Sequence, residues 1–103
     1  MARIVITSWG SHGDVDPYLA LAHGLRARGH APRLVVPAHY GPLVRGEGFD
    51  FHPLRPAVDP SDVAAVRRIM DPRRGTEYIL RELLLPALAD SYADLRAATA
   101  DAD

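Results

Sequence analysis

The sequence predicts one α/β domain built on a doubly wound parallel sheet, because three short apolar runs alternate with helical stretches. β-Branched residues dominate the run at 3–8, and a second run at 33–37 reads Arg-Leu-Val-Val-Pro. The third, at 49–54, alternates ring and polar side chains as a short strand does. Strands joined by helices in this order need right-handed crossovers. A chain of 103 residues leaves no room for a second independent core.

The first helix follows a turn that begins at Gly10. Pro17 suits the first helical position because its missing N–H has no partner there, so Asp16 is expected to be the N-cap. Apolar residues then recur at helical spacing, and Gly29 is expected to end the helix. The stretch at 42–48 predicts a second, shorter helix.

The sequence changes character after Leu54. Residues 55–75 are rich in proline and charge, and we expect an irregular loop there with one short helix at 61–70. Apolar spacing from 76 to about 98 predicts a long helix that Pro86 bends. In a β-α-β pattern such a helix leads into another strand, so we expect the sequence to be a fragment of a longer protein.

Composition excludes several kinds of chemistry. Lysine and cysteine are absent and all 12 basic residues are arginine, so the chain has no Schiff-base lysine, P-loop lysine or thiolate. A net charge of -1 gives no overall attraction to nucleic acid, and no apolar stretch is long enough for a membrane span. Because no leader-like segment opens the sequence, we expect a cytoplasmic protein.

The functional signal lies in the turn from Gly10 to Pro17, since ligands of such sheets bind at the carboxyl ends of the strands. Dinucleotide binding is disfavoured, because two carboxylates at a helix N-terminus would repel a pyrophosphate. An ionised aspartate instead suits a ligand that offers a hydroxyl, whose proton it can accept. Asp14 is therefore either a general base or a solvated turn residue. For Asp16, the N-cap role is favoured over the base.

The turn Gly-Ser-His-Gly-Asp-Val-Asp-Pro, the helix after it and the strand ending Val-Val-Pro-Ala-His-Tyr resemble the N-terminal domain of GT-B glycosyltransferases. The resemblance is to the branch that glycosylates sterols, other lipids and antibiotic aglycones, in which a G-[ST]-x-G-D-x-x-P turn opens the acceptor-binding domain. His12 departs from the arginine often seen there. The resemblance implies the Rossmann-like N-terminal half of a GT-B fold, truncated, with 1–103 as a partial acceptor-binding domain and the C-terminal nucleotide-sugar-binding domain absent.

The activity that this resemblance implies is inverting transfer of a hexosyl group from a nucleotide sugar to a hydroxyl of a lipophilic acceptor, with Asp14 as general base. The nucleotide sugar is a co-substrate bound mainly by the missing domain, and neither a cofactor nor a metal is implied. We expect the 103-residue piece alone to be inactive. The alternative is a non-catalytic binding module that pairs with a companion chain. Exposed core surface could also support a homo-oligomer.

Five residues are expected to border the acceptor pocket: His12, Gly13, His39, Tyr78 and Ile79. A packed or exposed structural role is the alternative for each histidine, and core packing is the alternative on the long helix. Gly10, Asp16 and Pro17 are assigned to the turn and the helix cap. The resemblance also implies that the region 56–70 forms part of the wall of this pocket. The loop at 55–75 is expected to be mobile when no acceptor is bound.

Overall fold

The computed structural model describes residues 1–103, and its centre is one sheet of three parallel strands in the order β1-β2-β3. The strands are β1 (Arg3–Thr7), β2 (Ala31–Pro37) and β3 (Asp50–Leu54). In the register, Ile6 lies beside Leu34, which lies beside Phe51 on the other side. The predicted parallel α/β sheet is confirmed, and the strand bounds lie within two residues of those expected from the sequence.

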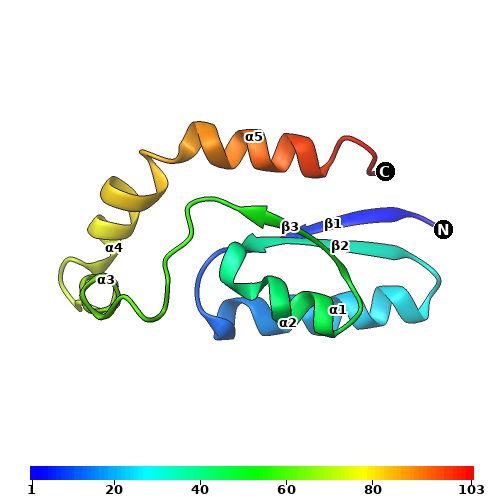
Figure 1. The fold of residues 1–103 in the computed structure, drawn as a ribbon, viewed down its shortest axis with the longest axis horizontal. Helices are drawn as coiled ribbons and strands as arrows, with labels where there is room; N and C mark the ends of the chain where they lie inside the picture. Colours follow the sequence, from blue (N-terminus) through cyan, green and yellow to red (C-terminus); the bar gives the residue numbers. More distant parts are fainter.

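Helices cover both faces of the sheet (Figure 1). One face carries α1 (His12–Ala27) and α2 (Gly41–Gly46), with the short 3-10 helix η1 (Ala38–Tyr40) leading into α2. The other face carries α5 (Leu88–Ala98). Between β3 and α5 come α3 (Val63–Ile69), α4 (Gly75–Tyr78) and the π-helical segment η2 (Ile79–Leu84). None of these helices combines the length and the apolar character that a membrane crossing requires.

The two faces of the sheet bury different amounts of apolar surface. On one face Leu34 and Val36 of β2 join the larger core under α1 and α2, while Val35 points to the smaller core under α5. This alternation follows from the two-residue period of a strand. Leu88 and Tyr92 of α5 remain more than half exposed, so the α5 face is only partly covered.

Helix α1 begins earlier than the proline signal predicts. Its N-cap is Ser11, so the N-cap role expected of Asp16 is wrong, and Pro17 lies inside the helix rather than at its first position. Asp14, at the third helical position, accepts a hydrogen bond from the Ser11 backbone N–H at 2.8 Å. This contact is one half of a capping box. It gives the Ser11 N–H a hydrogen-bond partner at the start of the helix, where backbone N–H groups have none within the helix.

The long helix predicted over 76–98 is interrupted at 85–87, where Pro86 lies. The expected bend is therefore present as a break between η2 and α5. Just before it the backbone widens into π-helical geometry, and the Leu85 N–H donates to the Leu80 carbonyl at 2.9 Å. The predicted helix at 61–70 is present as α3.

Candidate functional site

A cavity of 460 Å³ opens where β1 and β2 end, which is the carboxyl edge of the sheet. Its walls come from four parts of the chain that are distant in sequence: the first turn, the end of β2 with η1, the loop after β3 with α3, and η2. The lining residues are Trp9, Gly10, Ser11, His12, Asp14, Pro37, His39, Tyr40, Val58, Pro60, Val66, Ile69, Met70 and Ile79. The cavity is therefore largely apolar, and its polar side chains lie on the first turn and on η1.

Asp14 lines this cavity with one carboxylate oxygen engaged and the other free. Its Oδ2 accepts from the Ser11 N–H at 2.8 Å and lies 3.2 Å from the Ser11 Oγ. Its Oδ1 has no hydrogen-bond partner in the protein. Gly10 has a φ of 135°, and a Cβ at that position would collide with the Asp14 carboxylate. A glycine is therefore required for the carboxylate to fold back onto the turn.

Tyr40 holds the turn at Gly10 in place. Its side chain is buried, and its hydroxyl donates a 2.6 Å hydrogen bond to the Gly10 carbonyl. Burial raises the pKa of the Tyr40 hydroxyl, and the charges of Asp14 and Asp16 raise it further. The hydroxyl therefore keeps its proton at neutral pH and acts as a permanent donor to the turn.

His39 is a further polar residue of the cavity lining. Burial lowers the pKa of its imidazole, and although the charge of Asp59 opposes this effect, His12 adds to it. The ring is therefore mainly neutral at neutral pH, with one nitrogen as a donor and one as an acceptor. Its Nδ1 is buried and has no hydrogen-bond partner in the protein.

The residues predicted to border an acceptor fall into two groups. His12, His39 and Ile79 line the same cavity as Asp14. Gly13 and Tyr78 do not. Asp16 also lies outside this cavity, where its carboxylate is 3.8 Å from the His12 ring nitrogen Nδ1.

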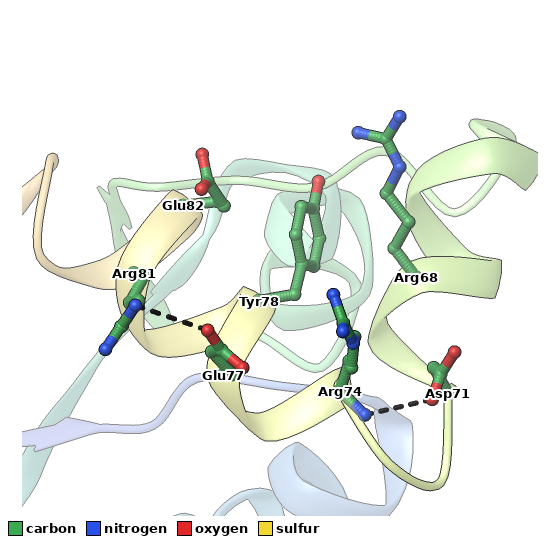
Figure 2. A pocket seen from close by; sticks show the side chains of 7 residues that line it. All are labelled: Arg68, Asp71, Arg74, Glu77, Tyr78, Arg81 and Glu82. Atoms are coloured by element: carbon green, nitrogen blue, oxygen red, sulfur yellow. Dashed lines mark hydrogen bonds and ion pairs between the residues drawn. The ribbon is translucent and has the colours of Figure 1, made fainter.

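Tyr78 belongs to a second cavity, of 310 Å³, between α3 and α4 (Figure 2). Three arginines and three carboxylates surround Tyr78 there: Arg68, Arg74, Arg81, Asp71, Glu77 and Glu82. Glu77 pairs with Arg81 at 3.3 Å, and Asp71 accepts from the Arg74 backbone N–H at 2.9 Å. Opposite charges therefore balance within this cavity, and it has no polar group buried without a partner, unlike the Asp14 cavity.

Several lining residues were not singled out from the sequence. Trp9 lies two residues after the end of β1, so its place at the carboxyl edge of the sheet was a signal that could have identified it. Tyr40 was considered beside His39 at the end of the second strand, with packing in a turn as the favoured role, and in the structure it is both buried and part of the cavity lining. Val66 and Met70 belong to the region 56–70 that the resemblance placed on the wall of the acceptor pocket, and both line the cavity.

Comparison with known proteins gives consistent matches. Residues 4–92 match the glycosyltransferase family 28 N-terminal domain. The sterol 3-beta-glucosyltransferase of Penicillium rubens is 39% identical over 83 residues, which cover 81% of this chain and 6% of that protein. The sterol 3-beta-glucosyltransferase of Aspergillus fumigatus is 42% identical over 64 residues, which cover 62% of this chain and 4% of that protein.

Among solved structures, the chain is similar to SsfS6, a glycosyltransferase from Streptomyces sp. SF2575. The TM-score is 0.52 and the identity 34%, over 63% of this chain and 19% of that one. The chain thus spans only a small part of the length of the relatives that it matches.

Proposed function

Because the chain belongs to the glycosyltransferase family 28 N-terminal domain family, we propose that it is the acceptor-binding part of a nucleotide-sugar-dependent hexosyltransferase. Residues 1–103 would form part of the N-terminal domain, and a C-terminal domain or a companion chain would hold most of the nucleotide sugar. The observation that carries the proposal is the position of Asp14, whose free Oδ1 belongs to a carboxylate that lines a largely apolar cavity.

The acceptor that suits this cavity is a lipophilic molecule with a hydroxyl group, such as a sterol, another lipid or a polyketide or antibiotic aglycone. Val66 and Ile69 of α3 and Met70, which directly follows that helix, offer apolar contacts, and Val58 adds another from the loop after β3. The volume of 460 Å³ lies within the range of about 300–1,000 Å³ that is usual for small-molecule sites. The names of the matched sterol 3-beta-glucosyltransferases support the same class of acceptor.

The proposed reaction is a single displacement at the anomeric carbon of the sugar. The acceptor hydroxyl donates a hydrogen bond to Asp14 Oδ1, and its oxygen attacks the anomeric carbon while its proton passes to the carboxylate. The bond from that carbon to the diphosphate oxygen breaks, and its electron pair leaves with the nucleoside diphosphate. Attack opposite the leaving group inverts the anomeric configuration. A carboxylic acid is much more acidic than an alcohol, so the proton transfers late in the reaction.

His12 and His39 are proposed to contact the acceptor beside Asp14. A neutral His39 can donate to or accept from an oxygen of the acceptor without adding charge to an apolar cavity. His12 lies on the first turn of α1 and stacks edge-on against Tyr40, with 5.1 Å between the ring centroids. Ile79 would provide apolar contact from η2.

The proposal is tested on the complete protein that contains this chain. Nucleotide sugars are screened in pairs with sterols and with polyketide alcohols, and each product is identified by its mass. We expect a product heavier than one of these alcohols by one hexosyl group. Binding of an alcohol without transfer from any donor would instead favour the non-catalytic module that pairs with another chain.

A further inference from the structure

Trp9 lies at the junction between β1 and the turn that carries Asp14. Its indole packs against the small core that contains Val35 and Leu54, and it also lines the 460 Å³ cavity. The Nε1–H donates a hydrogen bond of 2.7 Å to the carbonyl of Pro56. Since a partly buried indole N–H needs a partner, this bond fixes both the ring and the chain segment that it contacts.

That segment is the loop 55–62, which joins β3 to α3 and forms hydrogen bonds with the rest of the protein only at its start. The Arg55 backbone N–H donates to the Asp94 carboxylate at 2.8 Å, and the next residue accepts from Trp9. From Asp59 onward the hydrogen bonds of the loop are local, as where Asp59 accepts from the Ser61 N–H at 2.8 Å. The bond from Trp9 is therefore the last hydrogen bond between this segment and the sheet region before α3.

The position of α3 depends on this attachment. The main packing partner of α3 is α4, and where the two meet a Cβ on Gly75 would collide with the Ile69 carbonyl. Figure 1 shows α3 and α4 beyond the end of the sheet, with the loop from β3 leading to them. The loop and α3 together supply the apolar wall of the cavity, including Val58 and Met70.

We infer that Trp9 is an acceptor-specificity residue of this site. Its indole forms one part of the cavity wall. Its hydrogen bond to Pro56 holds in place a second part of the wall, which the loop 55–62 and α3 form. The indole and the hydrogen bond therefore each limit the size of the acceptor. This inference rests on the proposed function. Without the hydrogen bond the apolar wall can move outward, and the cavity then accepts larger molecules relative to small ones.

The test compares two substitutions in the complete protein. Trp9→Phe keeps an aromatic ring in the cavity and removes the donor to Pro56, whereas Trp9→Ala removes both. The kcat/KM is measured for a bulky acceptor, a sterol with one ring hydroxyl, and for a small one, 2-naphthol, with the same donor. We expect the sterol-to-naphthol ratio to rise about tenfold in Trp9→Phe and further in Trp9→Ala, through KM more than kcat.

Tyr92→Phe, on the exposed side of α5 and outside the cavity, is the matched control and should leave the ratio at its wild-type value. A wild-type ratio in Trp9→Phe and Trp9→Ala would overturn the inference, since a purely structural residue lowers activity on both acceptors alike. If Trp9→Ala does not fold, Trp9→Phe decides alone.

Failure of the proposed function gives a different result. A wild-type protein that binds both alcohols but transfers sugar to neither would contradict the proposed function. The inference is then decided by the ratio of the two dissociation constants, which equilibrium dialysis measures for the wild type and Trp9→Phe. A ratio that differs between the two proteins supports the role of Trp9 in selection, and an equal ratio overturns it.

Discussion

The Oδ2 of Asp14 lies 2.8 Å from the backbone nitrogen of Ser11, so the side chain that we propose as the general base also caps helix α1. The two roles use different oxygens, because Oδ1 has no partner in the protein. The cap holds the carboxylate in one position beside the cavity before an acceptor binds. Such preorganisation means that little has to be reordered when the acceptor arrives.

The capping role predicts a difference between two substitutions of Asp14. Asp14→Asn keeps an oxygen that can accept from the Ser11 N–H, whereas Asp14→Ala removes it. We expect the alanine variant to lose about 0.5–2 kcal/mol of unfolding free energy and the asparagine variant clearly less. Chemical denaturation measures both values. Equal losses would show that the contact with Ser11 does not stabilise α1.

The backbone at Gly10 predicts a large effect of a single methyl group. In Gly10→Ala the new Cβ would collide with the Asp14 carboxylate, and the φ of 135° is strained for any residue with a side chain. We expect a loss of about 1–3 kcal/mol in unfolding free energy, together with a displaced carboxylate. Gly24→Ala is the control, because its Cβ meets no atom within 4 Å and it lies inside α1. The unfolding free energy of Gly24→Ala should rise by about 0.4–1 kcal/mol. Thermal denaturation of both variants and the wild type measures these changes. Similar stability of the two variants would contradict the predicted clash.

Because the Tyr40 hydroxyl donates to the Gly10 carbonyl, we expect the turn at Gly10 to become more mobile when this hydrogen bond is removed. Tyr40→Phe removes a 2.6 Å bond from a buried hydroxyl and should cost about 0.5–1.5 kcal/mol of unfolding free energy. Tyr18→Phe, on the exposed face of α1, should cost much less. Amide hydrogen exchange offers a local readout, since faster exchange at the start of α1 is expected only in Tyr40→Phe. Unchanged exchange there would argue against a role of Tyr40 in the turn.

The pair Arg55 and Asp94 predicts how stability changes in acid. Hydrogen bonds from the Arg55 side chain, and then from its backbone N–H, lower the pKa of the Asp94 carboxyl below its ordinary value, against an opposing effect of burial. The unfolded state therefore binds this proton more readily than the folded state. The stabilisation is complete above the ordinary aspartate pKa of about 3.9 and is lost as the pH falls through the lower pKa of the folded state.

Asp94→Asn tests this relationship. We expect it to lose about 1–3 kcal/mol of unfolding free energy near neutral pH, because the charged partner of a half-exposed guanidinium is removed. Its unfolding free energy should also decline less steeply than that of the wild type as the solution is acidified below about pH 4. Urea denaturation across a pH series measures both effects. An acid decline identical to that of the wild type would mean that Asp94 does not titrate as described.

Local patterns were enough to predict the sheet and the helices, but not how the site is assembled. The apolar run around Leu34 and Val35 was enough to predict a strand, whereas its central place in the sheet comes from the structure alone. The predicted start of α1 was wrong because the Asp-Pro pair at 16–17 is typical of a helix start, whereas in the structure the helix begins earlier, where Asp14 accepts from the Ser11 N–H. That contact depends on the geometry of the turn, which the sequence pattern does not give.

The adjacent residues Tyr78 and Ile79 were predicted to share one pocket, yet they line different cavities. Consecutive residues on a helix point about 100° apart, so neighbours in sequence are rarely neighbours on a surface.

The most direct test of the account is the turnover of Asp14→Asn in the complete protein, with donor and acceptor both saturating. If Asp14 is the base, kcat falls by about 10²–10⁴ while acceptor affinity changes little. Asp16→Asn is the matched control, because Asp16 lies two residues away on the same helix but outside the cavity, and it should keep wild-type turnover. A kcat for Asp14→Asn equal to that of the wild type would contradict the assignment of Asp14 as the base.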